Sequence, residues 1–266
     1  MGDATVAAPP GLQGSRDAPV IAVLPAAGRG TRFGGERPKQ YARLGGRRLI
    51  EHAVGTMLDI DVVHGVVLVL AADDHRFDRL ESSADERLVL VAGGTTRAAS
   101  VQAGVEEVAR RFGDRAWALV HDAARPLVAA DDIRRLIAQV RADGNGGILA
   151  ARVADTLKRE RLVEPAGTGD GSAHASAAAS GWFVERTVPR EGLWQAQTPQ
   201  LFRAGALARA YAAARASNVP PTDEASVMER AGVDCLLVEA LHPNFKITRP
   251  VDLALAEAVL STRAAP

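Results

Sequence analysis

The stretch VIAVLPAAGRGTRFGGERPKQ, residues 20–40, joins an apolar, β-branched run to a glycine-rich segment that ends in a lysine and a glutamine. Val20–Leu24 is typical of a buried strand, so the loop leaves the carboxyl end of that strand. Phe33 stands where the dinucleotide fingerprint G-x-G-x-x-G needs a glycine, and the P-loop pattern is absent from the sequence. Small residues still let backbone N–H groups approach an anion closely. The loop therefore predicts a phosphate site of another kind, with a plain glycine turn as the alternative.

Apolar strands and amphipathic helices alternate along the rest of the chain. Continuous apolar strands separated by helices predict an α/β fold, a mostly parallel Rossmann-like sheet with helices on both faces. Ligands of such sheets bind at the carboxyl ends of the strands. The expected strands are Val20–Leu24, Gly65–Leu70, Leu88–Val91, Ala116–Val120 and Ile148–Val153, and the expected helices include Arg97–Phe112 and Asp131–Arg141.

Composition limits the function classes. The chain has 266 residues, 47% of them hydrophobic, and its 32 basic and 32 acidic residues balance, which argues against nucleic-acid and membrane-surface partners. The single cysteine, Cys235, excludes an internal disulfide framework, fits a reducing compartment and is expected in the core. Residues 1–18 resemble neither a secretory signal nor a membrane span, and we expect them to be a disordered extension. A single cytoplasmic domain is expected over residues 19–262.

One segment breaks the alternation of strands and helices. Residues 165–181 are rich in Gly, Ser and Ala, and strand-like pieces flank them at Arg152–Lys158 and Trp182–Val188. A flexible surface loop is one interpretation. The other is a projecting β-arm over about 152–190 with a flexible tip. Because a free two-stranded ribbon is marginally stable in water, such an arm needs a surface to pack against. We therefore expect a homodimer formed through the β-arm.

Several segments together carry a family resemblance. PAAGRGTRFGGERPKQY resembles the signature of nucleotidyltransferases with the GT-A-like nucleoside-triphosphate-transferase fold. More narrowly, the chain resembles the 2-C-methyl-D-erythritol 4-phosphate cytidylyltransferase family over about residues 19–262. Departures are residues 1–18, the insert at 165–181, and Gln197 in place of a usual leucine. The segments that follow the family order are AGGTTRAASVQAG (92–104), VHDAARPLV (120–128), DTLKR (155–159), VPREGLWQAQTPQLF (188–202), TDEASVMERAG (222–232) and NFKITRPVDLALAE (244–257).

The resemblance implies transfer of CMP from CTP to 2-C-methyl-D-erythritol 4-phosphate, giving 4-diphosphocytidyl-2-C-methyl-D-erythritol and pyrophosphate, in the non-mevalonate isoprenoid pathway. This reaction joins two anions, so it needs cations near the α-phosphate and relies on positioning and charge stabilisation. The acceptor phosphate is already largely ionised at pH 7, so an acid–base pair is unnecessary. By the resemblance, Arg32 and Lys39 stabilise the α-phosphoryl group, Lys246 orients the acceptor, and Arg190 reaches it from a neighbouring subunit.

The resemblance also assigns binding residues. Alternatives are a strand–helix turn with a cap for residues 93–100, an ion pair for Arg125 and an N-cap for Thr222, while Thr248 is treated mainly as a helix-start residue. Thr198 is expected to act across the dimer interface, and His121 to be a packed, hydrogen-bonded histidine. The nucleotide-binding set is Ala26, Ala27, Gly28, Gly30, Gly93, Gly94 and Ser100; the substrate-binding set is Asp122, Ala123, Arg125, Thr198, Thr222 and Thr248.

Metal and substrate alternatives stay open at this point. The histidines show no helical i, i+3 or i, i+4 pairing, so we expect no dedicated metal ligands, and Mg²⁺ would bind mainly through the CTP phosphates. A ribitol 5-phosphate cytidylyltransferase or another sugar-nucleotide pyrophosphorylase would share the first loop. A non-catalytic nucleotide-binding scaffold is the alternative from another class. Three cations assigned to one phosphate site, Arg32, Lys39 and Lys246, argue against a scaffold.

Overall fold

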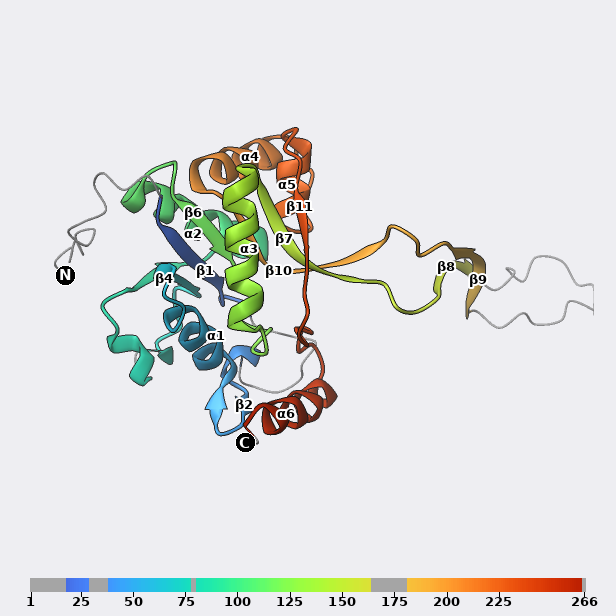
Figure 1. Ribbon diagram of the computed structural model, residues 1–266, viewed down its shortest axis with the longest axis horizontal. Coiled ribbons are helices and arrows are strands. Elements are labelled where there is room, and N and C mark those ends of the chain that lie inside the picture. Colours follow the sequence, from blue (N-terminus) through green and yellow to red (C-terminus); the bar gives the residue numbers. More distant parts are fainter. Residues whose placement is uncertain (1–17, 29–37, 78–79, 164–180, 265–266) are drawn as a thin grey trace, which may run out of the picture. The chain divides into compact units, whose positions relative to one another are not determined.

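The computed structural model describes residues 18–28, 38–77, 80–163 and 181–264 (Figure 1). The chain divides into two compact units, one made of residues up to 150 together with those from 196 onward, and the other of residues 151–195. Three predictions lie outside the described residues: the N-terminal extension up to residue 17, the site residues Gly30 and Arg32, and the flexible tip up to residue 180.

A seven-stranded sheet forms the centre of the larger unit. Its order is β11-β7-β10-β6-β1-β4-β5. β1 pairs in parallel with β4 and β6, β4 with β5, and β7 with β11, whereas β10 is antiparallel to β6. The mostly parallel sheet predicted from the sequence is therefore confirmed. Its strands are β1 (Val20–Pro25), β4 (Val63–Leu70), β5 (Leu88–Ala92), β6 (Trp117–Val120), β7 (Gly146–Arg152), β10 (Trp194–Arg203) and β11 (Leu236–Glu239).

Helices cover both faces of this sheet. Alternate residues of β1 point to opposite sides, as they do in any strand. Val20, Ala22 and Leu24 pack with α1 (Leu49–Leu58) and α3 (Ala130–Asp143), while Ile21 and Val23 pack with α2 (Arg97–Phe112), α4 (Ala204–Ala216) and α5 (Glu224–Arg230). The valines predicted to share one face of α2, Val101, Val105 and Val108, are all fully buried. The continuous apolar character of β1 thus reflects two covered faces.

Short elements complete the larger unit. Between β1 and α1 lie the 3-10 helix η2 (Lys39–Tyr41) and a small ribbon of β2 (Arg43–Leu44) and β3 (Arg47–Arg48). A second 3-10 helix, η4 (Glu81–Ala84), lies between β4 and β5. α6 (Pro250–Ala264) packs on a third apolar cluster that contains Leu44 and Ile247. This cluster fixes the segment just before α6, which carries Lys246.

The smaller unit is a two-stranded antiparallel ribbon of β8 (Leu157–Val163) and β9 (Gly181–Val188). The first strand was predicted five residues too early, because Arg152 ends β7 and Ala154–Thr156 is not strand. Leu162 pairs with Trp182, so their side chains share one face of the ribbon. Both are half exposed or more, at 50% and 67%.

Candidate nucleotide-binding site

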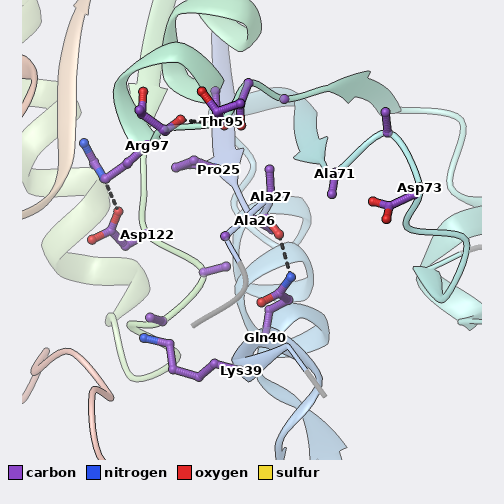
Figure 2. Close-up of a pocket in the computed structure, with 18 of the residues that line it drawn as sticks. Pro25, Ala26, Ala27, Lys39, Gln40, Ala71, Asp73, Thr95, Arg97 and Asp122 are labelled. Atoms are coloured by element: carbon purple, nitrogen blue, oxygen red, sulfur yellow. Dashed lines mark hydrogen bonds and ion pairs between the residues drawn. The ribbon is translucent and has the colours of Figure 1, made fainter. Parts of the chain in front are cut away.

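A pocket of about 740 Å³ lies where the loops after β1, β4, β5 and β6 meet (Figure 2). This volume suits a small organic ligand. Its position at the carboxyl ends of parallel strands is the one expected for this class of sheet. Ten of the predicted site residues line it: Ala26, Ala27, Gly28, Lys39, Gly93, Gly94, Ser100, Asp122, Ala123 and Lys246.

The loop after β1 is held from two sides. The Ala26 N–H donates to the Val69 carbonyl at 2.8 Å, and the Gln40 side-chain amide donates to the Ala26 carbonyl at 2.6 Å (Figure 2). Gln40 is buried and was not among the predicted site residues. Among the described residues, a Cβ at Gly28 would meet nothing within 4 Å, so Gly28 borders open space at the pocket. The predicted small-residue lining is therefore present and fixed in place.

The turn between β5 and α2 has no room for a side chain at Gly93 or Gly94. A Cβ at Gly93 would lie 2.6 Å from the Ala27 Cβ and 2.8 Å from the Ser100 hydroxyl oxygen, and one at Gly94 would lie 2.5 Å from the Ala99 Cβ. Thr96 caps α2 by accepting from the Ala99 N–H at 3.1 Å. The segment is therefore a capped turn, and it also lines the pocket, so its role in nucleotide binding stays a prediction.

Two lysines reach the pocket from distant parts of the chain. The Lys39 ammonium donates to the Ile247 carbonyl at 2.6 Å, and the Lys246 ammonium donates to Asp122 Oδ2 at 2.7 Å. These residues are separated by 208 and 124 positions, respectively. The contacts place two cations on one pocket, and clustered cations of this kind can stabilise a phosphoryl group.

Asp122 is held between two cations. Its Oδ1 accepts from Arg97 Nε at 2.9 Å, while Oδ2 accepts from Lys246. Burial alone would raise the pKa of Asp122, but the charges of Arg97 and Lys246 outweigh it and hold the pKa well below its usual range. The carboxylate is therefore ionised near neutral pH. Arg97 lines the pocket but was not among the predicted site residues, although it lies within the segment AGGTTRAASVQAG (92–104) that carries part of the family resemblance.

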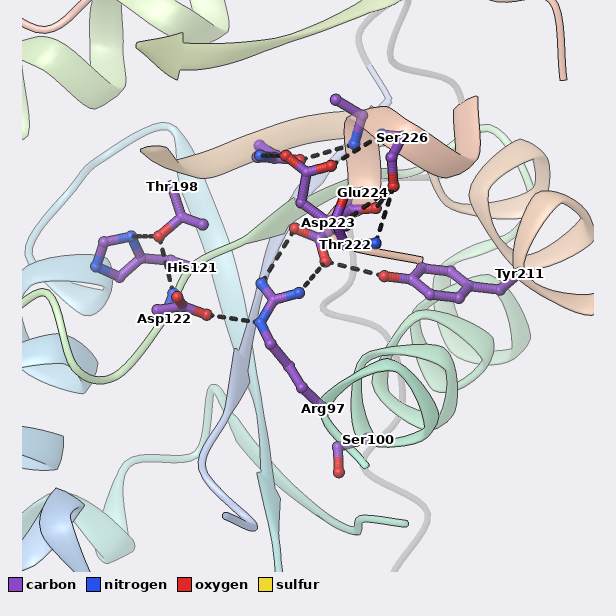
Figure 3. Close-up of polar contacts among 12 residues, drawn as sticks. Arg97, Ser100, His121, Asp122, Thr198, Tyr211, Thr222, Asp223, Glu224 and Ser226 are labelled. Atoms are coloured by element: carbon purple, nitrogen blue, oxygen red, sulfur yellow. Dashed lines mark hydrogen bonds and ion pairs between the residues drawn. The ribbon is translucent and has the colours of Figure 1, made fainter. Parts of the chain in front are cut away.

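A buried hydrogen-bonded chain supports the backbone of Asp122 (Figure 3). The Asp122 N–H donates to the Thr198 hydroxyl at 3.0 Å, and that hydroxyl donates to His121 Nδ1 at 3.1 Å. His121 Nε2 lies 3.0 Å from the Arg125 carbonyl, which can only accept, so Nε2 carries the proton. Burial lowers the pKa of His121 to about 4, so the ring is neutral at pH 7. The prediction of a packed, hydrogen-bonded histidine is confirmed.

Four predicted substrate residues lie outside the pocket lining. The Thr198 hydroxyl is engaged with Asp122 and His121, as described above. The Arg125 guanidinium donates to the Asn244 carbonyl at 2.7 Å. The Thr248 hydroxyl donates to Asp252 Oδ2 at 2.9 Å in the first turn of α6, in keeping with its expected helix-start role. The N-cap alternative for Thr222 is wrong: Asp223 is the N-cap of α5 and forms a capping box with Ser226.

Arg190 lies in the smaller unit, where its guanidinium donates to the Ala154 carbonyl. The nearby Arg152 guanidinium stacks over the Trp194 ring, 4.2 Å from the ring centroid.

Cys235 is partly buried against the α2 face of the core, and burial raises the pKa of its thiol to about 11. A thiol with so high a pKa is a poor nucleophile at neutral pH.

The described residues contain neither a metal-ligand cluster nor a membrane-spanning helix. Within residues 18–28, 38–77, 80–163 and 181–264, no group of three or more His, Cys, Asp or Glu side chains is arranged to hold a metal ion. The helices of that same part of the chain include none long and apolar enough to span a membrane.

The mostly parallel α/β sheet, with small residues and two lysines around a pocket at its carboxyl edge, defines a nucleotide-binding protein of the phosphoryl-transfer class. A family model described as 2-C-methyl-D-erythritol 4-phosphate cytidylyltransferase matches residues 20–262. The chain belongs to this family of nucleotidyltransferases.

Named relatives and solved structures agree with this membership. A 2-C-methyl-D-erythritol 4-phosphate cytidylyltransferase from Ectopseudomonas mendocina is 45% identical over 233 residues, which are 87% of this chain and 92% of the relative. One from Chromobacterium violaceum is 44% identical over 92% of this chain and 99% of the relative. A crystal structure of 4-diphosphocytidyl-2C-methyl-D-erythritol synthase is 35% identical with a TM-score of 0.72, covering 92% of this chain and all of that one. A crystal structure of the Francisella tularensis 2-C-methyl-D-erythritol 4-phosphate cytidylyltransferase is 29% identical with a TM-score of 0.71. It covers 90% of this chain and 99% of that one.

Proposed function

We propose that the chain transfers the cytidylyl group of CTP to 2-C-methyl-D-erythritol 4-phosphate, in isoprenoid precursor synthesis. A phosphate oxygen of the acceptor forms a bond to the α-phosphorus of CTP. The bond between that phosphorus and the oxygen bridging to the β-phosphate breaks, and pyrophosphate leaves. The observation that carries the proposal is the convergence of Lys39 and Lys246 on the small-residue pocket. The names of relatives that match about nine-tenths of the chain give the same activity.

Catalysis in this proposal is positioning and charge stabilisation. Lys39, together with Arg32, stabilises the charge that builds on the α-phosphoryl group, as preorganised cations do in phosphoryl transfer. Lys246 holds the acceptor phosphate, whose oxygen is the nucleophile. Asp122 accepts hydrogen bonds from acceptor hydroxyls, and the backbone at Ala123 lies beside it. These interactions need no proton transfer by a side chain, because the acceptor phosphate is already ionised.

We propose that the nucleotide occupies the part of the pocket between the loop after β1 and the turn after β5. Ala26, Ala27, Gly28 and Gly30 offer backbone N–H groups to the phosphates. Gly93, Gly94 and Ser100 form the cytosine pocket, where close backbone approach leaves room for a pyrimidine. Arg125, Thr222 and Thr248 then support the acceptor site from outside the pocket lining.

A Mg²⁺ ion bound with CTP fits this pocket. Two carboxylates are among its described lining residues, Asp73 and Asp122, and Asp122 is already bound by Arg97 and Lys246. Mg²⁺ keeps several waters and prefers nucleotide phosphates to an all-protein site. We therefore propose that the nucleotide phosphates hold the ion, which would supply further charge stabilisation when bound. The protein groups act by orienting the two substrates.

We also propose a cytoplasmic homodimer formed through the ribbon of β8 and β9. Leu162, Trp182 and Val184 share one face of the ribbon, with exposures of 50%, 67% and 61%. A second copy of this chain would cover these apolar side chains and receive Arg190 in its acceptor site. We keep only Arg190 in this cross-subunit role, because the Thr198 hydroxyl already bonds Asp122 and His121 of its own chain.

Pyrophosphate release tests the proposed reaction. The purified protein is supplied with Mg²⁺, one nucleoside triphosphate and one polyol phosphate, from panels that include ATP, GTP, 2-C-methyl-D-erythritol 4-phosphate and ribitol 5-phosphate. We expect turnover with CTP and methylerythritol phosphate, strongly preferred over purine triphosphates. Preference for ribitol 5-phosphate would support the sister enzyme. CTP binding with no turnover for any acceptor would support a scaffold.

A further inference from the structure

Arg97 bridges two carboxylates that lie on different elements (Figure 3). Its Nε donates to Asp122 at 2.9 Å, and Nη1 and Nη2 donate to Glu224 at 2.8 and 3.3 Å. Arg97 is the first residue of α2, Asp122 lies just after β6, and Glu224 is the first residue of α5. The planar fork of arginine thus ties three elements together, which a lysine would not do with the same geometry.

Glu224 has no exposed side-chain surface and does not line the pocket. The Tyr211 hydroxyl donates to its Oε1 at 2.9 Å. The start of α5 is itself fixed, because the Gln200 side chain accepts from the Ala225 N–H at 2.8 Å and donates to Asp223 at 3.0 Å. Burying a carboxylate this deeply is costly unless partners compensate it. The Tyr211 and Arg97 contacts supply that compensation.

We propose that Glu224, held by Tyr211, is a positioning residue that acts through Arg97 to keep Asp122 oriented toward the acceptor. This inference rests on the proposed function, in which Asp122 binds acceptor hydroxyls and Lys246 binds the acceptor phosphate. In the free protein Lys246 and Arg97 share Asp122. When the acceptor phosphate engages Lys246, Arg97 remains as the fixed cation on Asp122.

Charge explains why Arg97 needs a second carboxylate. Arg97 and Lys246 carry two positive charges, and Asp122 and Glu224 carry two negative ones, so the four groups balance. If the charge of Glu224 were lost, Arg97 would gain a net attraction to the incoming phosphates, which carry several negative charges. The guanidinium would then leave Asp122 for the phosphate. Glu224 therefore keeps Arg97 on Asp122 and leaves phosphate binding to the lysines.

The test compares Glu224→Gln with the native enzyme and with Glu107→Gln. Glu107 is a matched control, since it also pairs with arginines, Arg110 and Arg111, but lies farther along α2 and is not among the residues that line the pocket. For Glu224→Gln we expect the KM for the acceptor to rise at least tenfold, with the KM for CTP changed less than threefold. Tyr211→Phe should show the same selective change at smaller size. Glu107→Gln should leave both constants unchanged.

Equal changes in both KM values, or a lower Tm with unchanged KM values, would overturn the inference, because a merely structural role affects both substrates alike. Crystal structures of the native protein and Glu224→Gln, each soaked with inorganic phosphate, give a readout besides activity. Separation of the Arg97 guanidinium from Asp122 in the variant but not in the native protein supports positioning, and an intact Arg97–Asp122 contact in the variant refutes it. If the native enzyme turns over no acceptor, the proposed function fails while this structural comparison still decides the role of Glu224.

Discussion

At the residue scale, the pocket depends on a few charged side chains whose partners are already in place. Lys39 and Lys246 each make a short hydrogen bond, to the Ile247 carbonyl and to Asp122. Such contacts hold the ammonium groups at the pocket before substrates bind, so only short movements are needed as charge develops. Preorganisation of this kind makes single lysines important for turnover and much less important for folding.

Replacing Lys39 by Ala should therefore lower kcat by about 10²–10³-fold while the fold stays intact, as loss of a preorganised donor does. Pyrophosphate release measures turnover, and circular dichroism with a thermal scan checks the fold. Arg134→Ala is the control, since that exposed cation pairs with Asp61 and Asp131 away from the pocket. Near-normal turnover in a folded Lys39→Ala protein would refute the assigned role.

The buried His121 should make stability depend on pH. Burial lowers its pKa from 6.5 to about 4. Between pH 4 and pH 6.5, His121 is therefore protonated in the unfolded chain but neutral in the folded chain. Stability is thus complete above pH 6.5 and falls as the pH drops toward 4. The loss at pH 4.5 should be roughly 2–3 kcal/mol.

Urea unfolding at pH 7 and pH 4.5 tests this for the native protein and His121→Gln. Carboxylates titrate in both proteins and cancel in the comparison. The native protein should lose more free energy of unfolding than the variant over this interval. Identical pH dependence in the two would show that His121 contributes nothing to it.

At the element scale, α2 supplies one wall of the pocket, and its distance from the sheet decides where Arg97 and Ser100 lie. Gly104 sets that distance, because a Cβ there would come within 2.6 Å of a Val23 methyl and 2.8 Å of a Val69 methyl. Gly55 in α1 differs, since an added Cβ would meet only the far end of the Arg47 side chain, at 3.0 Å.

Gly104→Ala should consequently destabilise the protein by about 1–3 kcal/mol through overpacking, despite the better helix propensity of alanine. Gly55→Ala is the matched control and should be neutral or up to about 1 kcal/mol more stable. Denaturant unfolding measures both. If the two substitutions changed stability equally, the close contact of α2 with β1 and β4 would not be the limiting feature.

At the scale of the whole molecule, the proposed dimer links assembly to activity. In a symmetric dimer each ribbon would serve the site of the other subunit. Arg190 and Lys39 would then belong to different chains at any one site. This arrangement makes complementation between two defective subunits possible, which a monomeric site does not allow.

Mixing Arg190→Ala with Lys39→Ala should therefore restore activity. Each hybrid dimer contains one site with both residues intact, so random exchange should give about a quarter of native activity. Native mass spectrometry confirms exchange, and pyrophosphate release measures recovery. Exchange without recovery would mean that Arg190 acts within its own subunit.

A second variant tests the ribbon itself. Trp182→Glu should weaken the dimer and lower activity together.

The sequence alone determined the parallel sheet and the small-residue loop. The spacing of apolar residues and the local composition depend only on residues close in sequence. The strand β1, the helix α2 and the glycine turn at residues 93 and 94 could therefore be predicted from the sequence. Local signals were weaker at element ends: Asp223 rather than Thr222 caps α5, and β8 begins at Leu157. Several turn residues compete for a cap or a strand start, and packing selects among them.

Only the tertiary structure decided which charges meet. Arg97 and Glu224 are 127 residues apart, and no local pattern marks either as the partner of the other. Their contact depends on the strand order, which sets β6 beside β10 and so brings the start of α5 over Asp122. A sequence reveals which residues carry charge, because charge belongs to the side chain. Whether a charge is buried, paired or directed into a pocket depends on how elements far apart in the sequence pack together. The local spacing of apolar and polar residues does not determine that packing.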